Sequence, residues 1–382
     1  MFYVNLCRYF PKTKDLFVKQ NMKNSRRDFL KTFVAASATV PLISCANAST
    51  HEGKKLGVAL VGLGSYATNN LAPAFADTQY CRLAGIVTGT PAKAEIWKKK
   101  YNIPDKNIYN YQNFDEIAKN PDIDVVYVVL PNGLHHEFTL RAAKAGKHVI
   151  CEKPMAISTK EAEEMIAACK AAKVTLSIGY RLHYEPFTQE VMRLTREKDF
   201  GKVSFVEASF GFPLKDKKAW RLNPKLSGGG PMLDVGIYAL NAARYATGEE
   251  PISVTAQAIK TQPDIFVEGI EETLFWQMKF PSGAISNHTT TYNSYVQRLY
   301  VGYENGNLEM SPAFDYGPLK GKTSKGEMKL PIVHHQTLML DGICGDILNN
   351  RPMRTSGEEG LRDVKIMQAV FEAARTGREV RL

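Results

Sequence analysis

Residues 56–67, LGVALVGLGSYA, place an apolar run directly before two closely spaced glycines. Such a run ending in glycine is typical of a buried strand, and residues 66–76 that follow are typical of a helix. Gly62, Gly64 and Ala67 form a G-x-G-x-x-A loop, which lets a pyrophosphate approach the free N–H groups of a helix N-terminus. The pattern is weak alone and strong between a strand and a helix, so we predict a dinucleotide site. A purely structural turn is the alternative.

The alternation of strand and helix continues beyond this loop. Strands alternating with helices predict a parallel, doubly wound α/β sheet of the Rossmann type over residues 54–178. Ser158 and Glu161 form a capping box before the last of these helices. The further predicted strands cover residues 83–88, 125–130, 148–151 and 175–178, and the predicted helices cover 92–101, 133–145 and 160–171.

Beyond Gly179 strand patterns dominate. Because these strands follow one another and alternate in polarity, we predict a mostly antiparallel, open sheet. Residues 179–382 are therefore expected to form a second, α+β domain that binds substrate. The predicted strands cover 203–212, 252–260, 271–280, 283–292 and 297–301, and the predicted helices cover 232–247, 337–349 and 357–376.

Residues 1–48 predict an export leader. Residues 25–31, SRRDFLK, precede an apolar run at 32–43 that is too short for a membrane span of about 20 residues. The pair Arg26 and Arg27 resembles a twin-arginine signal, which the Tat export machinery reads as an address. Cleavage after Ala48 and lipidation of Cys45 compete, and both predict a periplasmic protein. A basic tail without an export role is the alternative.

The formal charge of +10 arises mainly from this leader, whose eight Lys and Arg residues against two Asp account for +6. The rest of the chain carries an ordinary charge, so we predict no nucleic-acid binding. The six cysteines include no CxxC pair, and neither a zinc site nor a disulfide framework is predicted. No set of residues has the spacing of metal ligands.

The residues after the second predicted strand indicate which dinucleotide binds. Residues 86–90, IVTGT, contain no carboxylate where NAD-binding folds carry Asp or Glu for the ribose hydroxyls. Thr88 and Lys93 instead offer a hydroxyl and an ammonium group, which suit a 2′-phosphate. The sequence therefore favours NADP over NAD, and the alternative is that Lys93 is only a solvated helix residue.

Two more segments are expected at the cofactor. Residues 131–135, PNGLH, and residues 151–154, CEKP, follow the third and fourth predicted strands. Ligands bind beyond the carboxyl ends of parallel strands, so both segments should face the same cleft as the glycine loop. The predicted cofactor-binding residues are Gly62, Gly64, Ser65, Tyr66, Ala67, Thr88, Lys93, Pro131, Asn132, His135, Glu152 and Lys153.

Together with Asp234 and Tyr238, which share one face of a predicted helix, these segments resemble the glucose–fructose oxidoreductase / inositol dehydrogenase / rhizopine-catabolism (Gfo/Idh/MocA) family. The resemblance covers essentially the whole chain after the leader. It assigns Lys153, Asp234 and Tyr238 to the catalytic centre, although many members carry histidine where this chain has Tyr238. It also implies a homo-oligomer, dimer or tetramer, that forms through the open sheet of the second domain.

The chemistry of a sugar oxidoreductase explains these residues. Oxidation of a hydroxyl needs a base for its proton while hydride leaves to nicotinamide. A free tyrosine has a pKa of about 10, and a neighbouring ammonium group favours the phenolate. We assign Tyr238 as the acid/base, Lys153 as its electrostatic partner and Asp234 as a partner of a sugar hydroxyl or of the lysine. Asp234 as the base, or Tyr238 as a buried structural residue, are the alternatives.

Polar and aromatic residues after the last strand of the first domain suit a polyol. Tyr180, Arg181 and His183 are expected to bind substrate, and Trp220 and Arg221 are expected to line the same cleft. Aromatic faces stack on sugar C–H groups, and Arg and His bind hydroxyls. A structural role between the domains is the alternative for Arg181 and His183.

The sequence therefore predicts a periplasmic, NADP-containing oxidoreductase that oxidises one sugar at C1 to its lactone and reduces a second sugar with the same cofactor. Export supports a retained cofactor, because an exported protein meets no free NADP pool. One branch of the family carries a long proline-rich arm between the leader and the first strand, whereas only residues 49–56 separate the two here. Retention of the cofactor by such an arm, and assembly of a tetramer through it, are therefore not expected. The alternatives are a sugar or inositol dehydrogenase with exchangeable NAD(P), a glycosidase of the same family, and a non-catalytic sugar-binding protein.

Overall fold

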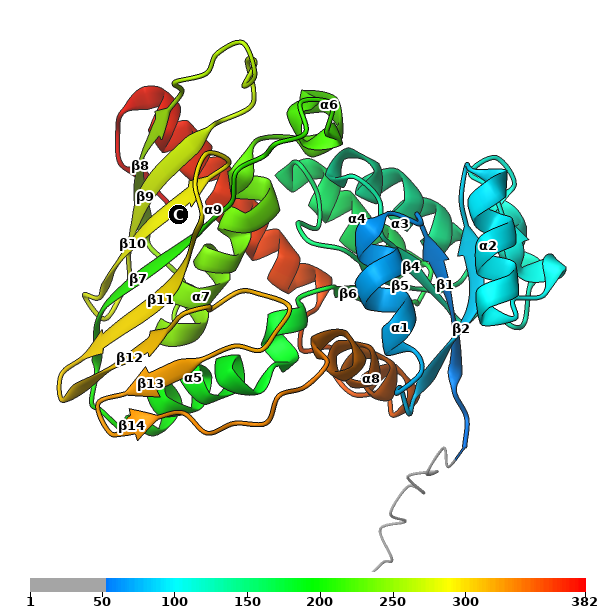
Figure 1. Ribbon diagram of the computed structural model, residues 1–382, viewed down its shortest axis with the longest axis horizontal. Coiled ribbons are helices and arrows are strands. Elements are labelled where there is room, and N and C mark those ends of the chain that lie inside the picture. The colour runs from blue at the N-terminus through cyan, green and yellow to red at the C-terminus, as the bar shows by residue number, and fades with distance from the viewer. Residues whose placement is uncertain (1–52) are drawn as a thin grey trace, which may run out of the picture. The chain divides into compact units, whose positions relative to one another are not determined.

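Residues 56–67 form the first strand and loop of a six-stranded parallel sheet in the computed structural model, which describes residues 53–382 (Figure 1). The strand order β3-β2-β1-β4-β5-β6 reverses beside β1, and every pairing is parallel. The predicted doubly wound sheet is confirmed. Its strands are β1 (Leu56–Val61), β2 (Cys81–Val87), β3 (Ile108–Tyr109), β4 (Val125–Val128), β5 (His148–Cys151) and β6 (Leu176–Ile178).

Apolar side chains bury both faces of this sheet. In β1, Ala59 and Val61 pack into one core, whereas Val58 and Leu60 pack into another. Burial on both faces explains why the strands read as continuous apolar runs. The helices α3 (His135–Lys144) and α4 (Thr159–Ala171) contribute to the first core, and α1 (Ala72–Ala74) and α2 (Pro91–Tyr101) contribute to the second.

The second sheet has nine strands in the order β14-β13-β12-β11-β7-β10-β9-β8-β15. Its pairings are antiparallel except that of β7 with β10, which is parallel, so the predicted mostly antiparallel sheet is confirmed. The strands are β7 (Val203–Gly211), β8 (Ser253–Ile259), β9 (Thr273–Lys279), β10 (Ile285–Thr291), β11 (Val296–Tyr303), β12 (Gly306–Met310), β13 (Gly321–Thr323), β14 (Gly326–Glu327) and β15 (Val380–Arg381).

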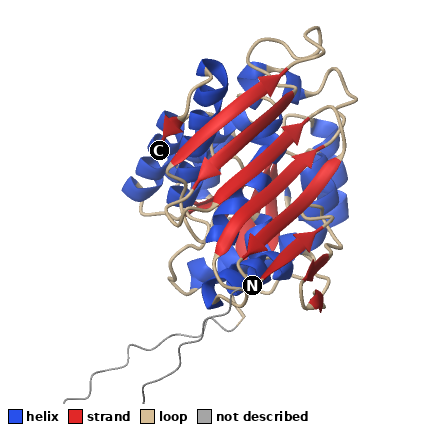
Figure 2. Ribbon diagram, turned by 90° about the vertical axis from the view of Figure 1, so that its left-hand side faces the viewer, coloured by secondary structure: helices blue, strands red, loops and turns tan. Residues whose placement is uncertain are grey.

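Among residues 53–382, helices cover one face of the second sheet, and Figure 2 looks onto the other face, on which none of these helices lies. The strand β9 shows the difference, because Leu274 and Met278 are buried while Phe275 and Gln277 are exposed. The helices of this part of the chain are α5 (Pro186–Glu197), α6 (Pro224–Ser227), α7 (Ile237–Thr247) and α9 (Gly357–Thr376).

Two helices differ from the sequence-based expectation. The sequence pattern predicts no helix over residues 186–197, yet α5 forms there, and the Glu185 carboxylate caps it by accepting a hydrogen bond from the Thr188 amide at 2.9 Å. The helix α8 (His335–Leu348) lies within the predicted second domain but packs on the first sheet, where Leu340 and Ile343 join the core of Val58. A single boundary at residue 179 therefore does not separate the two cores.

Within residues 53–382 no helix is long and apolar enough to cross a membrane. The predicted leader, with Arg26, Arg27 and Cys45, lies outside the residues that the structure describes.

Candidate active site

The glycine loop begins where β1 ends, at the carboxyl edge of the first sheet. Gly62 has a φ of +95°, and a Cβ there would lie 2.5 Å from the carbonyl oxygen of Val129, so only glycine fits. A Cβ on Gly64 would meet no atom of the described residues within 4 Å, and Gly64 borders the cleft beside the loop. The loop therefore leaves free the space that a pyrophosphate needs, and its residues fit a bound dinucleotide.

This cleft has a volume of about 420 Å³ and collects most of the predicted cofactor-binding residues. Lys93 borders it from α2, and its Nζ donates a hydrogen bond to the carbonyl oxygen of Leu63 at 3.2 Å. An ammonium group thus stands beside the glycine loop. The predicted residues that line the cleft are Gly62, Gly64, Ser65, Tyr66, Ala67, Thr88, Lys93, Pro131, Asn132, Glu152 and Lys153.

The exception is His135, which is fully buried and does not border the cleft. Its two ring nitrogens lie 2.8 Å from the carbonyl oxygens of Leu130 and Pro154. Burial lowers the pKa of His135, in spite of these two carbonyls. The expectation that His135 binds the cofactor is therefore corrected: it braces the two loops that follow β4 and β5.

Glu152 and Lys153 follow β5 and border the cleft. Glu152 is buried, and its Oε1 accepts a hydrogen bond from the hydroxyl of Tyr127 at 2.5 Å. Burial raises the pKa of Glu152. The Nζ of Lys153 donates to the backbone carbonyl of Asp234 and lies 3.8 Å from its Oδ1. The lysine thus connects the first domain to the turn that carries Asp234.

Asp234 lies in a π-helical turn, Met232–Gly236, immediately before α7. Its Oδ2 accepts hydrogen bonds from Nε of Arg221 at 2.6 Å and from the hydroxyl of Tyr292 at 3.0 Å. Burial alone would raise the pKa of Asp234, but the cations of Arg221 and Lys153 hold it below its usual range. Asp234 is therefore ionised, and it contacts three side chains from separate segments of the chain.

Tyr238 lies in the first turn of α7 and completes the predicted catalytic set. Its ring packs against Phe210 and Phe314, with centroid distances of 5.6 and 6.3 Å, and the Nζ of Lys153 lies 4.8 Å from its centroid. A second cleft of about 660 Å³ opens here, and Lys153, Asp234 and Tyr238 border both clefts. A phenol beside a cation at this junction can exchange a proton with a hydroxyl compound held next to a nucleotide.

Of the residues predicted to bind substrate, Arg181 borders the second cleft, Trp220 borders the first, and Arg221 borders both. Tyr180 and His183 border neither. The hydroxyl of Tyr180 donates to Asp363 at 2.5 Å, and the ring of His183 packs against Tyr245.

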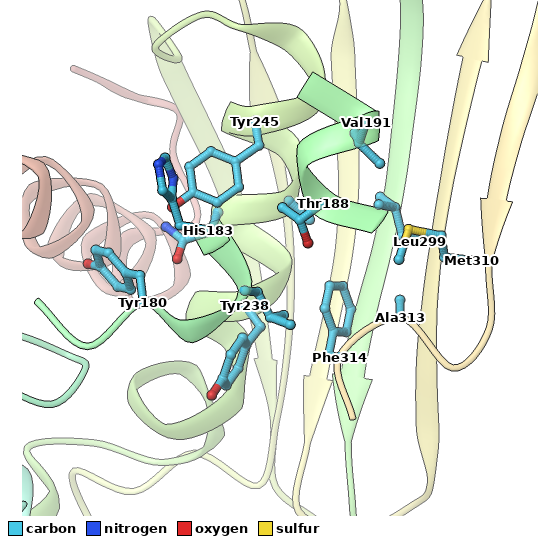
Figure 3. Close-up of a pocket in the computed structure, with 13 residues that line it drawn as sticks. Tyr180, His183, Thr188, Val191, Tyr238, Tyr245, Leu299, Met310, Ala313 and Phe314 are labelled. Carbon is cyan, nitrogen blue, oxygen red and sulfur yellow. The ribbon is translucent and has the colours of Figure 1, made fainter. Parts of the chain in front are cut away.

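Tyr180 and His183 line a separate cavity instead. Its volume of about 20 Å³ suits one water molecule and not a sugar, and the hydroxyl of Tyr238 points away from it (Figure 3). Burial lowers the pKa of His183 to about 4. The expectation that these two residues bind substrate is corrected, because the 3₁₀ turn Arg181–Tyr184 directs them towards α7 and α9.

Comparison with known proteins places the chain. The family model described as "Oxidoreductase family, NAD-binding Rossmann fold" matches residues 56–180, and the GFO/IDH/MocA C-terminal domain matches residues 188–309. The crystal structure of aldose-aldose oxidoreductase from Caulobacter crescentus is 42% identical, with a TM-score of 0.84, over 86% of this chain and all of that one. The chain belongs to the Gfo/Idh/MocA oxidoreductase family.

Two further relatives of this Gfo/Idh/MocA oxidoreductase differ more in sequence. D-xylose 1-dehydrogenase (NADP(+)) of Haloarcula marismortui is 28% identical over 334 residues, which cover 85% of this chain and 92% of that protein. The structure of scyllo-inositol dehydrogenase from Lactobacillus casei is 20% identical, with a TM-score of 0.70, over 86% of this chain and 98% of that one. At this identity the second likeness concerns the fold alone.

Two tyrosines of this oxidoreductase reach the site without a sequence signal. Tyr292 holds Asp234 from the end of β10, and Tyr316 borders both clefts from the loop between β12 and β13. The Tyr316 ring packs against that of Tyr66 in the glycine loop, with centroids 5.8 Å apart. Only the arrangement of the second sheet brings these residues to the cleft, so no local pattern could have indicated them.

Proposed function

We propose that this protein is an NADP-containing oxidoreductase that oxidises an aldose at C1 to its lactone. The hydride passes to the bound cofactor, which then reduces a second sugar. The convergence of Lys153, Asp234 and Tyr238 at the junction of two clefts carries this proposal. The likeness to an aldose-aldose oxidoreductase supports aldoses as substrates of both half-reactions. The NADP(+)-dependent xylose dehydrogenase supports reaction at C1.

Each residue of the set has a role in this proposal. Tyr238 takes the proton of the C1 hydroxyl and returns a proton to the second sugar. Lys153, whose Nζ lies 4.8 Å from the Tyr238 centroid, stabilises the charge that forms there. Asp234 holds Lys153 and accepts a hydrogen bond from a sugar hydroxyl. A bound nicotinamide supplies the hydride acceptor and donor.

NADP is proposed over NAD on the side chains that follow β2. The hydroxyl of Thr88 and the ammonium group of Lys93 border the nucleotide cleft, and no acid occurs between Ile86 and Ala94. A carboxylate there would repel a 2′-phosphate, whereas an ammonium group attracts it.

The proposal also includes export of the protein and its association into a homo-oligomer. The arginine pair in residues 25–31 supports passage through the twin-arginine route to the periplasm, with either cleavage after Ala48 or a lipid on Cys45. The helix-free outer face of the second sheet supports a homo-oligomer formed through that face (Figure 2).

One experiment separates this function from its alternatives. Purified protein is mixed with an aldose such as xylose, without added nucleotide, and the lactone and the alditol are measured. We expect both products in equal amounts, and NADP after acid release from the protein. A dehydrogenase with exchangeable cofactor forms lactone only when NADP or NAD is added, and a glycosidase acts only on glycosides. Protein that forms no product from any sugar, with or without nucleotide, contradicts the proposal.

A further inference from the structure

Arg181 carries a buried positive charge that forms no ion pair with a carboxylate of residues 53–382. Its side chain is 2% exposed, and its contacts within residues 53–382 are uncharged. One terminal nitrogen donates to the carbonyl of Asp315 and contacts Nδ1 of His335, both at 2.9 Å, and the other donates to the carbonyl of Phe314 at 2.5 Å. The Nε has no hydrogen-bond partner in the described part of the chain.

A second buried arginine, Arg244, differs from Arg181 because it has carboxylate partners. Arg244 is equally buried, but it forms ion pairs with Glu250, Glu359 and Asp363 at 2.6 to 2.8 Å. Burial of a charge without a counter-charge is costly, because the carbonyl dipoles replace only part of the lost hydration. The charge of Arg181 is therefore left to act on any anion that forms beside it.

The group beside it is the proposed acid/base. The Cζ of Arg181 lies 5.1 Å from the centroid of Tyr238 and 4.4 Å from that of Tyr316. We propose that Arg181 is a positioning residue of the proton transfer, which stabilises the phenolate of Tyr238 and anchors the loop that carries Phe314 against its ring. The inference rests on the proposed function, in which both half-reactions pass through this phenolate.

Arg181 supplies positive charge beside the Tyr238 phenolate in addition to that of Lys153. Lys153 also lies over the Tyr238 ring, but Asp234 neutralises part of its charge at 3.8 Å. The titratable groups around Tyr238 also include the phenols of Tyr66 and Tyr316 and the buried carboxyl of Glu152, which interacts with both Lys153 and Arg181. Burial would lower the pKa of Arg181, and the neighbouring phenols raise it instead. Arg181, which forms no ion pair within residues 53–382, therefore adds its positive charge to that of Lys153 beside the phenolate.

The test measures reduction of bound NADP by an aldose in a single turnover, across a range of pH. We expect Arg181→Gln to lower the rate at least tenfold near neutral pH and less at high pH, because Tyr238 then ionises without help. Arg181→Lys, which keeps the charge, should recover much of the rate. Gln297→Leu is the matched control: Gln297 accepts a hydrogen bond from the Phe314 amide at 2.9 Å, so the variant loosens the same loop without removing a charge. The factor by which Gln297→Leu changes the single-turnover rate should be the same at every pH.

A double variant shows whether Arg181 acts through Tyr238. In the Tyr238→Phe background, Arg181→Gln should cause no further loss, because the phenol is already gone. A loss of Arg181→Gln that is the same at every pH, or that adds fully to the loss of Tyr238→Phe, overturns the inference and indicates a structural role or direct contact with the sugar.

A second measurement does not depend on turnover. The tyrosinate absorbance that Tyr238→Phe removes should appear at lower pH in the unsubstituted protein than in Arg181→Gln, or than in Arg181→Met if the glutamine variant does not fold. Equal titration of this signal in both proteins overturns the inference. A protein without turnover on any aldose contradicts the proposed function instead, and leaves this absorbance test intact.

Discussion

The Nε of Arg221 donates a hydrogen bond to Oδ2 of Asp234 at 2.6 Å, and this contact bears on which residue moves the proton. The same oxygen accepts a second hydrogen bond from Tyr292, and the pKa of Asp234 lies below its usual range, because Arg221 and Lys153 outweigh burial. A carboxylate that is held in its ionised form is a weak base. The arrangement therefore favours Tyr238 as the acid/base and Asp234 as its support.

This assignment predicts different losses for two conservative variants. Tyr238→Phe keeps the ring and its packing on Phe210, so it should leave folding and cofactor content unchanged. It should lower the single-turnover rate by about 10²–10⁴-fold, the range of general acid/base catalysis. Asp234→Asn should lower the rate less and raise the sugar concentration needed for half-saturation. If Asp234→Asn abolishes turnover at every pH while Tyr238→Phe retains most of it, Asp234 is the base.

The two glycines of the loop predict opposite effects of alanine. Gly62→Ala should destabilise the fold, because its Cβ would lie 2.5 Å from the Val129 carbonyl and its φ is +95°. Gly64→Ala should leave the thermal midpoint of the nucleotide-free protein unchanged, since its Cβ meets no atom of the described residues within 4 Å. It should still weaken nucleotide binding, measured by calorimetry, because the methyl group enters the cleft. Unchanged nucleotide affinity in Gly64→Ala would count against a pyrophosphate at this loop.

The first domain could be predicted from the sequence because its signals are local. The run 56–61, the glycines after it and the segments after β4 and β5 each lie at one strand end, and parallel strands bring such ends together. Lys153, Asp234 and Tyr238 were placed together only through the family resemblance, and the structure brings them to one junction.

Other parts depend on long-range packing and could not be predicted locally. Tyr292 and Tyr316 reach the site only after the second sheet has formed, and α8 returns to the first core from a distant part of the chain. Tyr180 and His183 lie within two residues of Arg181 in sequence. Because of the 3₁₀ turn, however, their side chains pack towards α7 and α9, whereas Arg181 borders the second cleft. A polar cluster in sequence therefore does not show which of its members faces a cleft.

Lys93 provides the test of NADP preference. A charge-assisted hydrogen bond is worth roughly 1.5–3 kcal/mol, so Lys93→Glu should weaken NADP binding by more than tenfold and NAD binding less. Lys99→Glu makes the same change of charge on an exposed position of α2 that does not border the cleft, and it should change neither affinity much. Equal losses for both nucleotides in Lys93→Glu, or NAD in the purified protein, would overturn the assignment.

The leader predicts export that depends on its arginine pair. Because the Tat receptor reads both arginines, Arg26→Lys together with Arg27→Lys should leave the protein in the cytoplasm, as cell fractionation would show. Palmitate labelling that is lost in Cys45→Ala would indicate a lipid anchor and not cleavage after Ala48. Unchanged export of the double lysine variant would remove the twin-arginine prediction.

Buried neutral histidines predict that the protein loses stability in mild acid. His288 stacks on Trp276 in the second sheet, and burial lowers its pKa to about 3. Burial also lowers the pKa of His335 to about 3 and that of His183 to about 4. A histidine of the unfolded chain has a pKa of about 6.5. Below that pH the unfolded state binds protons that the folded state does not, so the stabilisation present above pH 6.5 is lost as the pH falls towards 4.

The slope of the free energy of unfolding against pH can be measured by denaturant unfolding between pH 7 and pH 5. Each such histidine should lower the free energy of unfolding by about 1.4 kcal/mol per pH unit once the pH is well below 6.5. His288→Gln removes one titrating group and should reduce the slope by about that amount, whatever it does to stability at pH 7. His334→Gln is the matched control, because the side chain of His334 is exposed. A slope that His288→Gln leaves unchanged would mean that His288 takes up its proton in the folded protein, and that water reaches its ring inside the second sheet.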